Sequence, residues 1–178
     1  MKVPFLRPDI RLEDIRWMTR SVESGWLVPG PHADRFEKEL ARFLKVPYAV
    51  LVDSATAALH MSLVLAGVEE GDEVITTPLS WVATSNVILY QRAKVVFADV
   101  DPKTGILDPD EVEKKITKKT KAILLVHLYG QMADMKRFKK LRISMVLPSL
   151  KIPPMRLKRV AMVFVPGSTA FLRVSVFM

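Results

Sequence analysis

The feature that most restricts the fold is an alternation, from residue 48 to residue 141, of short apolar runs with longer segments of helical spacing. The apolar runs have the length and composition of strands buried on both faces, which is typical of parallel sheets. Strands separated by helices predict an α/β domain with a mostly parallel sheet and flanking helices. The expected strands are 48–52, 73–77, 94–98 and 122–126.

Helices are expected before the first strand and between the strands. Apolar residues recur at helical spacing over 12–22, and a second amphipathic helix carries Phe36, Leu40 and Phe43 on one face. The intervening segment from Trp26 to Pro31 is expected to be a loop, because two prolines and a glycine interrupt it. The helices expected among the strands are 55–66, 82–90, a short charged one that opens at Pro109, and 133–141.

Residues 142–178 have a different composition. They contain no Asp, Glu, Asn, Gln, His, Tyr or Trp, and no helical or alternating period persists in them. All six charged residues there are basic, which leaves 21 basic against 19 acidic residues in 1–141. The basic balance of the chain therefore belongs to this tail rather than to a patch on the main domain, and no nucleic-acid partner is expected. We expect a domain over 1–141 and an aberrant, poorly structured basic tail over 142–178.

Several classes of protein are excluded by composition. The chain has no cysteine, so it has neither disulfides nor thiolate metal ligands, and its three scattered histidines predict no metal site. The first residues lack the apolar core of a signal peptide, and no apolar run is long enough to cross a bilayer. A cytoplasmic protein without a membrane partner is the expectation. No glycine-rich nucleotide loop occurs, which argues against nucleotide cofactors.

The first strand-to-helix turn contains Ser54, Ala55 and Thr56. Small side chains allow backbone N–H groups to approach an anion, and a helix N-terminus favours negative charge. Ser and Thr are also ordinary helix caps, and the spacing alone favours that simpler role.

Two further groups of residues follow expected strands. Trp81 lies after the second strand, where an open α/β sheet binds its ligands, although a core aromatic would fit equally well. His127, Tyr129 and Gln131 follow the fourth strand and suit a general base, a substrate donor or a structural cluster. His60 lies inside a helix, and its side chain is expected to pack against other residues or to lie on the surface. Nothing in the sequence around His32 indicates a partner for its side chain.

Taken in order, seven motifs of the chain resemble one family, the DegT/StrS type of pyridoxal-phosphate (PLP) sugar aminotransferases. The resemblance covers residues 1–141. The matching motifs are Ser24-Gly25-Trp26-Leu27 with Gly30-Pro31, Phe36-Glu37, Val50 to His60, Gly71 to Thr76, Trp81 to Asn86, Thr120 to Ile123 and Val126 to Gln131.

The resemblance implies a fold and roles for particular residues. The fold implied is an incomplete large domain of a fold type I PLP-dependent transferase, normally a homodimer whose active site lies at the subunit boundary. Ser54, Ala55 and Thr56 would hold the PLP phosphate, and Trp81 would stack on the pyridine ring. The substrate-binding residues implied are Trp26, Gly30, His127, Tyr129 and Gln131. Asp53 stands where the family often has Asn, so a carboxylate is placed beside the phosphate site.

The chemistry of this family needs two more residues. An aspartate keeps the pyridine nitrogen protonated, and a lysine holds PLP as a Schiff base. Neither motif is present, so no catalytic residue is assigned, and Lys45, Lys94 and Lys121 are interpreted as surface or strand-edge residues.

The tail suggests a reason for this absence. When the third nucleotide of each codon is joined to the first two of the next, the stretch from Ser144 to Lys158 permits Asp-Gly-Ile-Ala-Val-Ile-Glu-Asp-Ser-Ala-His-Ala-Leu-Glu. In the same frame, Val174 to Met178 permits Phe-Ser-Phe-Tyr, the approach of the family to its lysine. The hypothesis is a frameshift at about Arg142; the alternative is a genuine basic extension.

The function expected is that of a truncated aminotransferase. Its intact relative would transfer an amino group from glutamate to a keto-sugar nucleotide in cell-surface polysaccharide or amino-sugar biosynthesis. A non-catalytic PLP- or phosphate-binding module, and an inactive pseudogene product, are the alternatives, with a basic nucleic-acid-binding protein ranked last.

Overall fold

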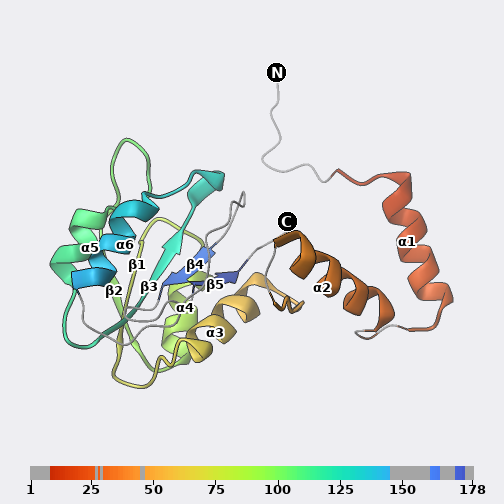
Figure 1. Ribbon diagram of the computed structural model, residues 1–178, viewed down its shortest axis with the longest axis horizontal. Coiled ribbons are helices and arrows are strands. Elements are labelled where there is room, and N and C mark those ends of the chain that lie inside the picture. The colour runs from red at the N-terminus through yellow and green to blue at the C-terminus, as the bar shows by residue number, and fades with distance from the viewer. Residues whose placement is uncertain are drawn as a thin grey trace. The chain divides into compact units, whose positions relative to one another are not determined.

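The computed structural model describes residues 9–144 apart from 27, 29, 45 and 46, together with 161–164 and 171–174. The chain divides into two compact units, 1–51 and 52–178, which are described separately (Figure 1). None of the helices in the described part of the chain is long and apolar enough to span a membrane.

The first unit contains the two helices expected from apolar periodicity, α1 (Leu12–Glu23) and α2 (Pro31–Leu44). The carboxylate of Asp14 accepts a 2.8 Å hydrogen bond from the backbone N–H of Arg11 and so satisfies a donor at the start of α1. Pro31 was expected in the loop, whereas it is the first residue of α2. Proline suits this position because its fixed φ is helical and a first-turn N–H has no partner to lose.

Residues 48–52 do not form the expected strand. Within the described residues they pair with no neighbouring strand, and the side chain of Tyr48 is 84% exposed. The backbone N–H of Leu51 donates instead to Oε1 of Glu37 on α2, at 2.7 Å. An apolar run becomes a strand only when another strand supplies hydrogen bonds, and here a side chain supplies one instead.

The second unit is built around a five-stranded sheet of order β2-β1-β3-β4-β5. The parallel strands β1 (Glu73–Thr76), β2 (Lys94–Phe97) and β3 (Thr120–Val126) confirm three of the expected strands. In register, Ile75 lies between Val96 and Ile123. Two antiparallel strands that the sequence did not predict complete the sheet, β4 (Ala161–Phe164) and β5 (Phe171–Val174).

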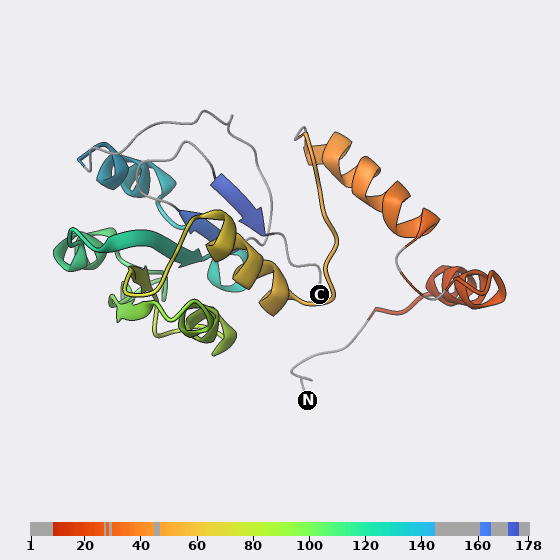
Figure 2. The same cartoon turned by 90° about the horizontal axis from the view of Figure 1, so that it is seen from below.

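Helices cover both faces of this sheet. The helices α3 (Ala55–Leu65) and α4 (Ala83–Tyr90) pack on one face, and α5 (Pro109–Lys115) and α6 (Met135–Ser144) on the other. Figure 2 shows α6 (blue) and α4 (yellow-green) on opposite sides of β3. Each face has its own apolar core, because successive strand residues point to opposite faces. The first core contains Leu63, Val74, Val87, Ile88 and Leu124, and the second Ile75, Val112, Ile123, Leu125 and Phe138.

The boundary expected at residue 141 stays a prediction. Helix α6 continues from Met135 to Ser144, and the strands β4 and β5 lie in the segment expected to be a tail. Residues 145–160, 165–170 and 175–178 lie outside the described residues.

Candidate functional site

The candidate site lies at the edge of the sheet where β1 and β3 end. Helix α3 leads into β1, and α4 leads from β1 into β2, so both helices run against the parallel strands. Both helices therefore begin at this carboxyl edge, with Ser54 and Trp81 just before their first turns. In open α/β sheets this edge is where ligands bind.

Ser54 caps the first turn of α3. Its backbone is extended, and its Oγ accepts a 3.1 Å hydrogen bond from the backbone N–H of Ala57. The backbone N–H of Ala58 donates to the carbonyl of Ser54. Ala55 and Thr56, the first two residues of the helix, are half-buried. The simpler expectation from sequence, a serine cap, is therefore present; a cap is compatible with anion binding because it leaves the preceding N–H groups unengaged.

Asp53 lies beside this turn with an exposed side chain. Its Oδ1 is 3.5 Å from the hydroxyl of Ser54, which donates to it. A carboxylate is thus close to the place where a phosphate would sit, and it would oppose the attraction of the helix N-terminus.

Trp81 projects into solvent from the loop between β1 and α4. Its side chain is 79% exposed, so it is not the core aromatic that the sequence also allowed. The loop around it is fixed by short bonds: the backbone N–H of Thr84 donates to the carbonyl of Trp81 at 2.9 Å, and the hydroxyls of Ser80 and Thr84 are 2.9 Å apart. An indole held in this way offers a free ring face for stacking.

The residues after β3 divide between the interior and the surface. His127 is buried, and its Nδ1 accepts a 3.2 Å hydrogen bond from the backbone N–H of Ala133. Tyr129 is 93% exposed and has a left-handed backbone with φ 52°, and Gln131 is exposed. Of the roles that the sequence left open for His127, the structural one is present here.

Trp26 and Gly30 belong to the first unit, which is described by itself. The indole of Trp26 lies against Gly30 so closely that a Cβ at position 30 would overlap the ring. Gly30 is therefore required by this contact. A role for both residues in substrate binding stays a prediction.

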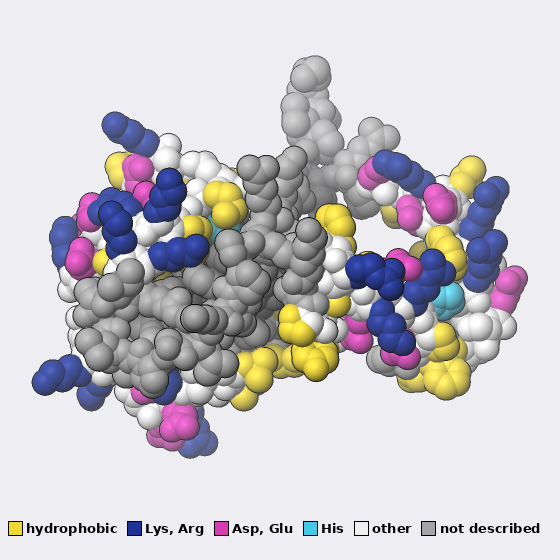
Figure 3. Space-filling view, in the orientation of Figure 1, with side chains coloured by type: hydrophobic (Ala, Val, Ile, Leu, Met, Phe, Trp, Pro, Cys, Tyr) yellow, Lys and Arg dark blue, Asp and Glu magenta, His cyan; other side chains and the backbone are white. Residues whose placement is uncertain are grey.

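The other two histidines serve packing. The ring of His32 meets that of Trp17 edge-on at 5.7 Å beside an apolar hollow of the first unit, and the ring of His60 meets that of Tyr90 at 5.6 Å. Hydrophobic side chains (yellow) are visible on the surface in Figure 3. The exposed fractions show that Met18 and Val22 on α1 are solvent-exposed.

A third loop reaches the carboxyl edge, and sequence reasoning missed it. At Gly105, which has φ 69°, a Cβ would lie 3.5 Å from Leu79 of the Trp81 loop and 3.6 Å from Leu128 of the His127 loop. The loop between β2 and α5 thus packs between the other two. The signal available in the sequence was a glycine in a turn-forming segment, because glycine adopts positive φ freely.

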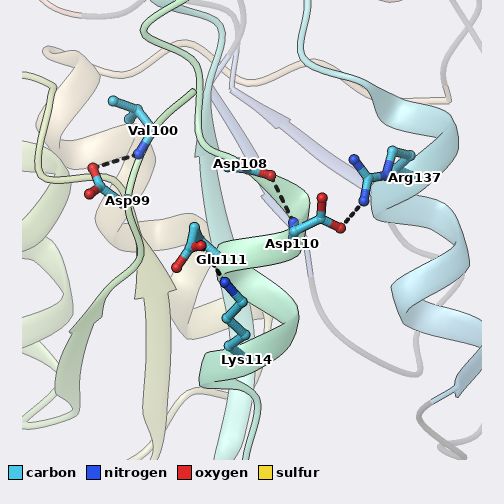
Figure 4. A network of polar contacts seen from close by, with 7 residues as sticks. All are labelled: Asp99, Val100, Asp108, Asp110, Glu111, Lys114 and Arg137. Atoms are coloured by element: carbon cyan, nitrogen blue, oxygen red, sulfur yellow. Dashed lines mark hydrogen bonds and ion pairs between the residues drawn. The ribbon is translucent and has the colours of Figure 1, made fainter. Parts of the chain in front are cut away.

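Polar contacts fix the end of this third loop. Asp108 caps α5 by accepting from the backbone N–H of Asp110, and the side chain of Asp110 pairs with Arg137 on α6 (Figure 4). Lys114 pairs with Glu111 one turn along α5. The pair of Asp110 and Arg137 links α5 to α6 and so holds the end of the loop.

The lysines considered for catalysis lie at the opposite edge of the sheet. Lys94 is the first residue of β2 and pairs with Glu73 at 3.0 Å, and the Lys121 side chain crosses Gly67 at the C-terminus of α3. Between Lys121 and His127 the chain runs about 20 Å along β3, at ~3.3 Å per residue. Both lysines are strand-edge residues, as the sequence predicted. Lys45 lies outside the described residues.

Residues 8–149 match the DegT/DnrJ/EryC1/StrS aminotransferase family. The chain belongs to this family. The resemblance identified in the sequence is therefore confirmed, and the match extends a few residues past the expected boundary at 141.

A curated relative and two solved structures are similar to this chain. The spore coat polysaccharide biosynthesis protein SpsC of Bacillus subtilis is 45% identical over 133 residues, 75% of this chain and 34% of SpsC. A Streptococcus pneumoniae protein assigned as a sugar aminotransferase, in its PLP form, has a TM-score of 0.75 with 35% identity over 79% of this chain and 36% of its own. NtdA from Bacillus subtilis, with bound cofactor PMP, has a TM-score of 0.74 with 35% identity over 80% of this chain and 34% of its own.

These similarities confirm the predicted fold class, an incomplete large domain of a PLP-dependent aminotransferase with a small parallel sheet and flanking helices. The chain spans about a third of the length of the curated relatives that it matches.

Proposed function

We propose that this chain is the cofactor-phosphate part of a PLP-dependent aminotransferase that moves an amino group from glutamate to a keto-sugar nucleotide. Membership of the family supports the reaction class. The similarity to SpsC, a spore coat polysaccharide biosynthesis protein, supports a role in cell-surface polysaccharide or amino-sugar biosynthesis. The observation that carries the proposal is the capped turn at the start of α3.

The residues of this turn fit a phosphate group. In the described part of the chain, the backbone N–H groups of Ala55 and Thr56 have no hydrogen-bond acceptor, because the cap of Ser54 serves Ala57. These two donors, the hydroxyl of Thr56 and the positive end of the α3 dipole are the elements that bind phosphate at helix N-termini. Residues Ser54, Ala55 and Thr56 would thus hold the phosphate.

The neighbouring loop fits a planar ring. Trp81 lies just before α4 at the same edge of the sheet, and its indole is exposed. It would stack on the pyridine ring and exclude water from one face of it. When bound, PLP supplies the electron-withdrawing ring on which amino transfer depends. Tyr129 and Gln131, which are exposed, would contact the substrate, and the buried His127 would serve substrate binding through the loop that carries them. A substrate-binding role for Trp26 and Gly30 is proposed from the family resemblance alone.

This chain would bind PLP without completing amino transfer. No lysine can be assigned to the cofactor, since Lys94 and Lys121 lie at the far edge of the sheet, and no aspartate motif for the pyridine nitrogen occurs in the sequence. The frameshift at about Arg142 explains both absences. The coding DNA tests this directly: an alternative frame that lacks the two expected motifs overturns the frameshift and favours a genuine extension.

The closed cores on both faces of the sheet favour a folded phosphate-binding module over an unstable pseudogene product. Pairing of two copies into a homodimer and a cytoplasmic location remain part of this proposal, supported by the family resemblance alone.

The proposal is tested by titrating the full chain with PLP and following its absorbance, the tryptophan fluorescence and the melting temperature. We expect saturable binding that raises the melting temperature, since a ligand of the native state stabilises it. Pyridoxal without its phosphate is the matched control and should bind far more weakly. Equal binding of the two would contradict the phosphate site.

Borohydride reduction followed by mass spectrometry tests the catalytic part. We expect no stoichiometric adduct at a single lysine. One reproducible adduct together with transaminase turnover would show that this chain is active.

A further inference from the structure

We propose that His127 is a positioning residue: its neutral imidazole, protonated at Nε2, closes the loop 128–133 and fixes Tyr129 at the carboxyl edge of the sheet. The observations are the bond at Nδ1, the backbone of Tyr129 and the burial at both ends of the loop. The ligand-facing role of Tyr129 rests on the proposed function, whereas the role of His127 in shaping the loop does not.

The hydrogen bond defines the form of the imidazole. The backbone N–H of Ala133 donates to Nδ1 of His127 at 3.2 Å, so Nδ1 is the acceptor and carries no proton. A ring whose Nδ1 accepts is neutral, and its single proton is then on Nε2. The imidazole is therefore a fixed acceptor toward the loop rather than a base facing solvent.

Tyr129 has a conformation that needs such support. Its φ is 52° and that of Gly130 is 81°, so two successive residues are left-handed. Glycine adopts this region freely, but a tyrosine does so at a cost that its surroundings must overcome. Inside the loop, the backbone N–H groups of Gly130 and Gln131 donate to His127 and Leu128, which forms the tight turn.

Both ends of the loop are held in place. Leu128 packs against the second core and lies next to Gly105, while Ala133 is buried in that core. The bond from Ala133 to His127 joins these two ends through a buried side chain. Without an acceptor at this position, the N–H of Ala133 would be buried and unsatisfied, and the loop would open to reach water.

Packing of the Tyr129 side chain does not offset the strain of its backbone, since the residue is 93% exposed. A strained residue whose side chain contacts solvent is better explained by a ligand than by stability. A phenol ring with a free hydroxyl suits a ligand rich in hydroxyls, such as a sugar, because the ring covers its apolar face and the hydroxyl bonds to it.

The test compares two substitutions in the full chain. In His127→Asn the acceptor Oδ1 is bonded to Cγ, as Nδ1 is in histidine, whereas the leucine of His127→Leu has no acceptor. We expect amide hydrogen exchange at Ala133 to rise at least about tenfold in the Leu variant, as for a buried hydrogen bond that is lost. The Asn variant should keep most of the protection, and the sheet amide of Leu124 should be unchanged in both.

Nitrogen-15 NMR of the histidine ring gives a second readout on the unmodified chain, independent of whether the Leu variant folds. We expect the signature of an unprotonated Nδ1 and a protonated Nε2. The opposite tautomer, or equal exchange at Ala133 in the Asn and Leu variants, would overturn the proposal. Neither measurement uses PLP or a sugar. A failure of this proposal can therefore be distinguished from a failure of the proposed function.

Discussion

The hydroxyl of Thr117 donates a 2.6 Å hydrogen bond to the buried carboxylate of Glu73, at the amino end of β1. Lys94 donates to the other oxygen of the same carboxylate at 3.0 Å, and the backbone N–H of Glu73 donates to the carbonyl of Lys119. One acidic side chain thus joins the starts of three neighbouring strands. The hydrogen bond from Thr117, followed by that from Lys94, holds the pKa of Glu73 below its ordinary value of 4.5.

This pKa predicts how stability depends on pH. Because the pKa of Glu73 is lower in the folded chain, its contribution is fully present above about pH 4.5 and is lost as the pH falls through the folded value. Thr117→Val removes the largest cause of the shift. We expect the variant to melt below the wild type at pH 7, with the gap narrowing below about pH 4.5.

Glu73→Gln is the control for this prediction, since it removes the titrating group and keeps the size of the side chain. Thermal melts across the pH range check both variants. A gap between the wild type and Thr117→Val that stays constant from pH 7 to pH 3 would contradict the linkage.

Leu63 and Leu65 offer a matched comparison on α3. Leu63 is fully buried in the first core, whereas Leu65 is 73% exposed. We expect Leu63→Ala to lower the free energy of unfolding by about 2–5 kcal/mol, because it leaves a cavity. Leu65→Ala should change it by less than ~0.5 kcal/mol. Urea titration measures both, and similar losses would mean that α3 packs differently.

Replacing Asp53 with a neutral residue should raise the affinity of the chain for the phosphate of PLP. Asp53→Asn removes a negative charge 3.5 Å from the hydroxyl of Ser54 and keeps the shape of the side chain. We expect PLP to bind more tightly, by about fivefold or less, because an exposed charge acts through water. The advantage should shrink in 1 M salt, where screening is strong. Weaker binding in the Asn variant would show that Asp53 assists the site.

Substitutions at Ser54 and at Lys121 should distinguish an effect on PLP binding from an effect on stability. Ser54→Ala removes the cap of α3 and should cost about 1 kcal/mol of stability as well as weakening PLP binding. Lys121→Met removes a cation beside the C-terminus of the same helix. It should lower the melting temperature slightly and leave the PLP dissociation constant unchanged. Loss of PLP binding in the Lys121 variant would reverse our assignment of the two sheet edges.

Local patterns predicted most of the second unit. Periodicity located α3 to α6 within a few residues, and short apolar runs located β1, β2 and β3. The order of motifs identified the family before any geometry was available. The strand expected at 48–52 was wrong, since an apolar run does not reveal whether another strand will pair with it. The strands β4 and β5 were not predicted, because no alternating period marks them in the sequence.

The arrangement of the site was less predictable. That Gly105 lies between Leu79 and Leu128 depends on contacts between loops distant in sequence, which no local pattern contains. The buried bond of His127 and the left-handed Tyr129 arise from the same tertiary constraints. Sequence therefore supplied the chemical groups at the edge, while packing decided which of them point inward.

Strand β1 spans only Glu73 to Thr76, yet one end contributes to stability and the other to the candidate site. Its amino end carries the carboxylate that joins three strands, and its carboxyl end leads to the loop of Trp81. The two ends are about 10 Å apart, at ~3.3 Å per residue. Substitutions near the amino end should therefore change thermal stability, and substitutions near the carboxyl end should change ligand specificity. Ligand specificity can then evolve without loss of the fold.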